Sequence, residues 1–136
     1  MIWPIAAANN LEQLKRESLA RKLHDLKQLP AGWNGPRSKT IDPQVLESAD
    51  RFIQFIASHE KLGESIPSPE IGPMPEGGVS VEWTGGETGG RELVVFIRSA
   101  NNIEFAAASD ATGYELSGVV QEFSELLPQL SWLIDG

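Results

Sequence analysis

The chain has 136 residues, 40% of them hydrophobic and 22% charged, with a formal net charge of -8, which predicts one globular domain rather than a disordered chain. Because cysteine is absent, disulfides, thiolate nucleophiles and zinc sites built on thiolates are excluded. No apolar run reaches the roughly 20 residues that span a bilayer, and residues 1–8 lack the basic flank and the long apolar core of a secretory signal, so we expect a cytoplasmic protein without membrane contact.

Two helices are predicted before any strand. Residues 9–28 are mostly good helix formers, and one helical face carries three leucines, Leu19, Leu23 and Leu26. The second helix is expected over residues 43–62, with Asp42 as its N-cap and Pro43 at its first position. Its apolar face consists of Val45, Leu46, Ala49, Phe52, Ile53 and Ile56.

The middle of the chain predicts an antiparallel meander. Residues 65–78 contain four prolines, each of which removes a backbone donor, so only an edge strand or an extended connection fits there. Residues 79–83 alternate apolar and polar side chains, and a glycine-rich turn at 84–90 leads into residues 93–97, which are apolar on both faces. An Asn-Asn pair then favours a tight reversal into a strand at 103–107.

The last element is predicted as a helix over residues 117–134, kinked or broken at Pro128. The whole chain, residues 1–136, is therefore expected to form a single α+β domain. In that domain a three- to four-stranded antiparallel meander packs with two N-terminal helices and one kinked C-terminal helix. The outer side chains of the central strand, Val94 and Phe96, should be covered by a helix, another protomer or a partner, and the C-terminal helix is the first candidate.

The sequence offers few groups for catalysis. The only histidines, His24 and His59, fall in separate predicted helices, and we expect both at the surface. Spacings typical of metal sites are absent, so no metal and no cofactor are expected. The glycine pairs within residues 85–90 precede a strand rather than a helix, which favours a hairpin loop over a phosphate site. Glu82 and Glu104 invite comparison with a catalytic carboxylate pair, although a solvated sheet face explains them equally well.

The most distinctive segment is residues 29–36, in which glycines flank Trp33 and Asn34. These glycines permit unusual backbone angles, so Trp33 can point inward as a plug between the two helices or outward as an anchor for a partner. Because large aromatic side chains are mostly buried, we predict the plug. In the other interpretation, Trp33 and Asn34 belong to a binding surface.

Three motifs together carry a resemblance to a known family. They are Gly32-Trp33-Asn34-Gly35, the helix at 43–56, and the run from Pro73 through Gly77-Gly78 to Glu82-Trp83. This pattern resembles a family of small bacterial proteins of unassigned function, in which Gly-Trp-Asp-Gly-Tyr-Gly-Ala precedes a helix and a Pro/Gly turn leads into a strand ending Glu-Trp. The resemblance covers about residues 29–105. This chain has Asn34 where the family has Asp, and Pro-Arg-Ser at residues 36–38 where the family has Tyr-Gly-Ala. The resemblance implies an α+β fold and supplies no activity.

Charge is unevenly distributed along the chain. Residues 1–39 hold seven Lys or Arg against three acids, whereas residues 40–136 hold four against sixteen. Residues 64–125 alone contain eleven acids and two arginines. The basic N-terminal helix is therefore expected either to pack onto its own acidic body or to meet a charged partner. The overall acidity weakens an interpretation as a nucleic-acid binder.

These features predict a non-catalytic protein that binds another macromolecule, as an inhibitor, antitoxin or accessory subunit of a bacterial or phage system. The partner is expected to be a protein with a basic surface, without direct nucleic-acid binding, and a homo-oligomer is compatible with the sequence. The predicted binding residues are Trp33, Asn34, Glu82, Val94, Phe96 and Glu104. The alternative is a small carboxylate-dependent hydrolase or nucleotide-processing enzyme using Glu82, Glu104 and Asp110, which a pocket collecting these acids would favour.

Overall fold

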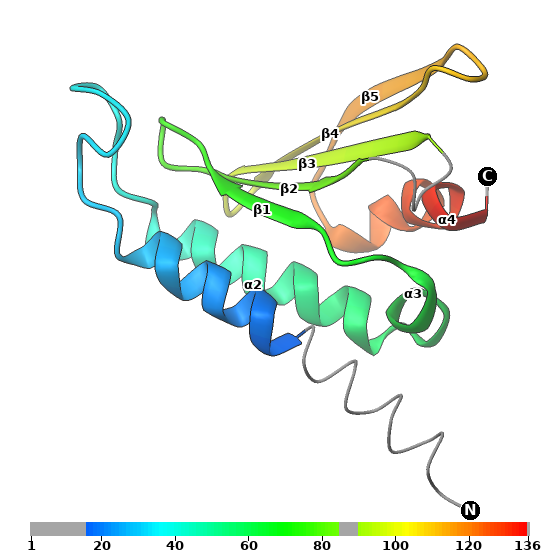
Figure 1. The fold of residues 1–136 in the computed structure, drawn as a ribbon, viewed down its shortest axis with the longest axis horizontal. Helices are drawn as coiled ribbons and strands as arrows, with labels where there is room; N and C mark the ends of the chain where they lie inside the picture. Colours follow the sequence, from blue (N-terminus) through cyan, green and yellow to red (C-terminus); the bar gives the residue numbers. More distant parts are fainter. Residues whose placement is uncertain (1–15, 85–89, 136) are drawn as a thin grey trace, which may run out of the picture.

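The computed structural model describes residues 16–84 and 90–135, drawn in colour in Figure 1. Residues 16–27 are helical and are called the N-terminal helix below. The elements that follow are α2 (Pro43–Ser58), α3 (Glu60–Ser65), β1 (Glu70–Pro73), β2 (Val79–Trp83), β3 (Arg91–Ser99), β4 (Asn102–Ser109), β5 (Tyr114–Val120), the 3-10 helix η2 (Phe123–Leu126) and α4 (Leu127–Asp135). Within the described ranges, no helix is long and apolar enough to cross a membrane. Gly85, Gly86 and Gly89 lie outside the described residues, whereas Gly90 is described and has a φ of 80°.

The strands form one antiparallel sheet in the order β1-β2-β3-β4-β5, in which each strand pairs with the next along the chain. The predicted α+β class and the predicted meander are confirmed. The sheet has five strands rather than three or four, because an edge strand is added on each side of the predicted core. On one side, the proline-rich stretch supplies β1, one of the two forms expected for it.

The other additional strand, β5, contains residues that were predicted to be helical. Residues 117–120 pair with β4 instead, so the helix prediction is wrong over this stretch. Val119 and Val120 are β-branched, which suits an extended chain, and Gly118 lies directly against the ring of Phe105. A Cβ atom added at Gly118 would lie only 3.0 Å from that ring, so this position favours glycine.

The helical part of the C-terminal segment begins at Phe123. There Glu122 and Glu125 form a capping box around the start of η2. Pro128 is the second residue of α4, where a missing backbone donor costs little, since the first N–H groups of a helix have no partner within it. The segment divides into two short helices, one of the two forms expected, but the division falls just before Pro128, where η2 passes directly into α4.

The helices and the sheet form two layers, and Figure 1 shows every described helix on the same face of the sheet. The core between the layers includes Phe52 of α2, Val95 of β3 and Leu130 of α4, each with no exposed surface. The leucines of the predicted first helical face are also buried, and this helix lies beside α2. α2 ends at Ser58, earlier than predicted, because His59 takes an extended conformation before α3 begins.

The opposite face of the sheet carries no described element (Figure 1). α4 was the first candidate to cover Val94 and Phe96, and this prediction is wrong. Leu130 and Leu133 of α4 are fully buried in the core on the helix-bearing face. Val94 and Phe96 point to the other face and are only half-buried.

Candidate functional site

The register of the sheet gathers four predicted binding residues on its uncovered face. Glu82 lies opposite Val94 across β2 and β3, and Phe96 lies opposite Glu104 across β3 and β4. Directly opposite residues of antiparallel strands point to the same face of a sheet. These four side chains alternate with buried neighbours such as Val95, so they share the face away from the helices.

An apolar strip runs along the middle of this face. It consists of Val94 and Phe96 of β3 with Ala106 and Ala108 of β4, all of which retain contact with solvent. Five glutamates occupy outward strand positions around the strip, together with Ser80, Ser117 and Val119; they are Glu70, Glu82, Glu92, Glu104 and Glu115. The strip and these glutamates are called the acidic outer face below. Its pattern combines apolar area with charge of one sign.

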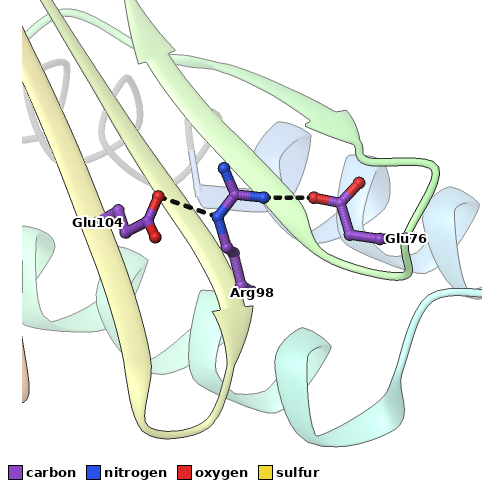
Figure 2. A network of polar contacts seen from close by, with 3 residues as sticks. All are labelled: Glu76, Arg98 and Glu104. Carbon is purple, nitrogen blue, oxygen red and sulfur yellow. Dashed lines mark hydrogen bonds and ion pairs between the residues drawn. The ribbon is translucent and has the colours of Figure 1, made fainter.

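Arg98 lies at one end of this face, and Figure 2 shows it between the carboxylates of Glu76 and Glu104. Its Nε donates to a carboxylate oxygen of Glu104 at 2.9 Å, and its Nη1 forms an ion pair with Glu76. The guanidinium carbon also lies 5.5 Å from the centre of the Phe96 ring. The hydrogen bond that Arg98 donates to Glu104 is the largest cause that raises the pKa of Arg98, with the charges of Glu104 and Glu76 adding to it. The arginine is thus occupied by carboxylates of its own chain.

Glu76 reaches Arg98 from the turn between β1 and β2, whose shape depends on two glycines. Gly77 has a φ of 101°, in the left-handed region. At Gly78, an added Cβ atom would lie 2.8 Å from the carbonyl oxygen of Ile97, so a side chain would force this turn away from β3. The Gly-Gly pair of the sequence motif therefore brings the turn close to Arg98.

Glu70 and Glu82 are a second distinctive feature of the acidic outer face. They lie directly opposite each other across β1 and β2, where like charges oppose pairing. Within the described residues, neither carboxylate takes part in a hydrogen bond or an ion pair. A cation from outside this surface would relieve their repulsion.

The other two predicted binding residues lie in the loop between the N-terminal helix and α2. Trp33 is half-buried and does not belong to the core, so the predicted plug between the helices is wrong. Its Nε1 donates to the carbonyl oxygen of Lys39 at 2.9 Å, because the loop folds back on itself around the buried Ser38. Asn34 is exposed, and its backbone N–H donates to the hydroxyl of Ser38 at 2.9 Å.

This loop contacts the sheet at the end where Arg98 lies. The N–H of Lys39 donates to the carbonyl oxygen of Pro75 at 2.8 Å, and that of Asp42 to Gly77 at 3.1 Å. Both acceptors belong to the turn that carries Glu76 (Figure 1). Trp33 and Asn34 are therefore beside the β1–β2 turn rather than within the strip, and their part in binding stays a prediction.

The groups considered for catalysis are dispersed. Glu82 and Glu104 lie on the same face with β3 between them, whereas Asp110 follows β4 at the opposite end from Arg98. The pockets found among the described residues lie around the N-terminal helix, α2 and residues 63–69, and none is lined by these acids. His24 and His59 are both exposed, as predicted. The described residues also contain no cluster of three or more His, Asp or Glu suited to a metal ion.

Comparisons with protein-family models, curated proteins and solved structures find no match to this chain.

Sequence reasoning missed Arg98, Glu70 and Glu76 as parts of this surface. Glu70 lies in the proline-rich stretch, where the sequence left open whether a strand forms at all. Val94, Phe96 and Arg98 alternate along β3, so the face of Arg98 follows the strand period, but its contact with Glu76 depends on where the β1–β2 turn lies. The sequence signal for Arg98 was a basic residue at the end of an apolar strand. The partners of Arg98, however, are set by the tertiary structure.

Proposed function

We propose that this chain is a non-catalytic protein-binding domain that binds a basic protein through the acidic outer face. The proposal is supported by one observation above all, an uncovered sheet face whose central apolar strip is surrounded by glutamates. Exposed apolar area rimmed by polar groups is typical of interaction sites. The strip supplies area that a partner can remove from water, and the glutamates set the sign of charge that the partner must carry.

The charge of this face favours a protein over a nucleic acid. Phosphate groups would be repelled by Glu70, Glu82 and Glu92, and Arg98 is already paired with two carboxylates. Lysine or arginine side chains would instead be attracted, and one placed between Glu70 and Glu82 would relieve the repulsion across β1 and β2. The partner is therefore a protein with basic side chains beside an apolar patch.

In its sharper form, the proposal makes the chain an inhibitor, antitoxin or accessory subunit of a bacterial or phage system. Carboxylates spaced across a sheet can bind the lysine and arginine side chains of a partner that otherwise bind phosphates. A nucleic-acid-binding channel is the kind of basic surface that such a face would block. The enzyme alternative has no comparable support, because no described pocket brings Glu82, Glu104 and Asp110 together.

The central test is the substitution Glu82→Lys. Opposite Glu70, a lysine forms an attractive cross-strand pair, so we expect the free energy of unfolding to stay equal or rise by about 0.2 to 1 kcal/mol. Binding of the basic partner should weaken, because the same lysine repels it. If Glu82→Lys keeps its stability but binds the partner more weakly, the loss of binding cannot be due to unfolding. Urea denaturation and binding kinetics with the partner purified from the source organism measure the two effects.

The matched control is Glu47→Lys, which makes the same charge change on the exposed side of α2, where Glu47 pairs only with Arg51. Wild-type association should slow as salt rises, since the screening length falls from about 10 Å at 0.1 M to about 3 Å at 1 M. The proposal fails if the association rate is independent of salt and Glu82→Lys binds as tightly as Glu47→Lys.

A further inference from the structure

The two edges of the sheet differ in how well they are protected from pairing with another strand. β1 has four residues and ends at Pro73, and another proline, Pro69, directly precedes it. Proline has no N–H and is one of the devices that keep edge strands from pairing. β5 has seven residues, contains no proline or lysine and carries one charge, Glu115. Because β5 ends the strand order, its outer backbone edge pairs with no other strand in the described part of the chain.

β5 also carries the exposed large apolar side chains of the described residues. These are Tyr114, Leu116 and Val119, with exposed fractions of 37%, 41% and 66%. Tyr114 and Leu116 lie on the helix-bearing face, where Tyr114 packs against Trp132 of α4 at 4.9 Å between ring centres. Val119 lies on the outer face, beyond Glu104 in the same cross-strand row. Apolar side chains therefore flank the free edge on both faces.

We propose that β5 pairs antiparallel with β5 of a second copy of this chain, so that two sheets join into one continuous sheet across a twofold axis. Such an interface presents the same strand from both copies. Its backbone groups would be satisfied by the partner strand, as they are in β-strand addition. This inference is independent of the basic partner proposed above, because it concerns the sheet edge rather than the strip.

A second copy fits this edge better than a partner of opposite charge. The chain has a net charge of -8, so two copies repel each other over most of their surface, and β5 is the stretch with little charge. A register centred on Ser117 places Leu116 of one copy opposite Gly118 of the other. Because glycine has no side chain, it leaves room for the leucine. The same register places Glu115 opposite Val119, so that the two Glu115 carboxylates do not meet.

The first experiment measures self-association of the full chain by sedimentation equilibrium over a concentration series. The wild type should form a dimer, and Leu116→Lys with Val119→Lys should weaken dimerisation at least about tenfold, because each lysine enters the interface twice. Both positions are exposed, so the monomer should keep its melting temperature. The control Ala111→Lys with Thr112→Lys adds the same charge in the exposed turn before β5 and should dimerise like the wild type.

The second experiment does not depend on the lysine variants. Since the chain has no cysteine, Ser117→Cys introduces a single thiol at the proposed axis. Opposite residues of antiparallel strands have Cα atoms about 4.5 to 5.5 Å apart, a distance that suits a disulfide. Oxidation should link Ser117→Cys into dimers much faster than Ala111→Cys. A wild type that stays monomeric throughout, a dimer unaffected by the two lysines, or equal cross-linking of both thiols would each overturn the proposal.

Discussion

Trp83 and Trp33 illustrate how the direction of a side chain decides its role. Trp83 ends β2 on the helix-bearing face and is 2% exposed. Its ring meets Phe52 edge-on at 6.1 Å, and its Nε1 donates to the carbonyl oxygen of Pro67 at 2.8 Å. Trp33 makes the same kind of hydrogen bond, to Lys39, from a loop that lies outside the core. A satisfied indole N–H therefore does not distinguish a core tryptophan from a loop tryptophan, whereas burial does.

Alanine substitution should separate the two residues. Trp83→Ala empties a core site and should lower the free energy of unfolding by about 3 to 5 kcal/mol. Trp33→Ala removes a half-buried ring and one hydrogen bond, so its cost should be nearer to about 1 kcal/mol. Urea denaturation of both variants measures the difference. Equal losses would mean that Trp33 stabilises the loop far more than its contacts indicate.

The C-terminal helical segment depends on a capping box at its first turn. Glu125 accepts hydrogen bonds from the backbone N–H groups of Glu122 and Gln121 at 2.9 and 2.8 Å. These bonds favour the ionised carboxylate, and they lower the pKa of Glu125 below its ordinary value. The box stops β5 from continuing and starts the segment that carries Leu126 and Leu130 into the core.

This box predicts a pH dependence of stability. A folded-state pKa that is lower than the unfolded one stabilises the protein above the unfolded pKa, and this contribution is lost as pH falls through the folded pKa. Glu125→Gln keeps an acceptor oxygen but does not titrate. Its free energy of unfolding should therefore fall less steeply than that of the wild type in the acid range just below the ordinary glutamate pKa. Parallel slopes in urea titrations at a series of pH values would contradict the assigned role of Glu125.

At the scale of the whole molecule, the two faces of the sheet differ. Figure 1 shows the described helices on one face, and the strand register places the acidic outer face on the other. The ion pairs of the described residues, such as Lys61 with Asp135, are exposed to solvent. They are few compared with the nineteen acidic residues of the chain. The four pairs made by Arg51, Lys61 and Arg98 do not join the N-terminal helix to the sheet. Self-repulsion of like charges therefore acts against the folded state.

Added salt should stabilise the protein at neutral pH, because screening reduces repulsion among the acids while the exposed ion pairs contribute little. Thermal unfolding at increasing sodium chloride concentration tests this. A double variant, Glu70→Gln with Glu82→Gln, removes the like-charge pair across β1 and β2 and should respond less to salt than the wild type. A melting temperature that falls with salt would show that attractive pairs dominate instead.

The sequence predicted much of the fold and part of the candidate site. The apolar faces of the first two helices, the alternation in β2 and the two-faced apolar run in β3 all led to the correct elements, because each signal is local and periodic. Glu82 with Glu104 and Val94 with Phe96 were predicted as two pairs, and the register placed both pairs on one face. The sequence also excluded thiol chemistry, since the chain contains no cysteine.

Tertiary structure alone decided the rest. Residues 117–120 have apolar side chains compatible with a helix or a strand, and pairing with β4 selected the strand. The position of the β1–β2 turn brought Glu76 to Arg98, and closure of the loop around Ser38 kept Trp33 out of the core. Whether a helix covers Val94 and Phe96 depended on which face of the sheet α4 packs against. The amphipathic pattern of α4 does not determine this, because the same apolar side chains could pack against either face. Local periodicity determines which side chains share a face, whereas the packing of elements far apart in the sequence determines which face is left open.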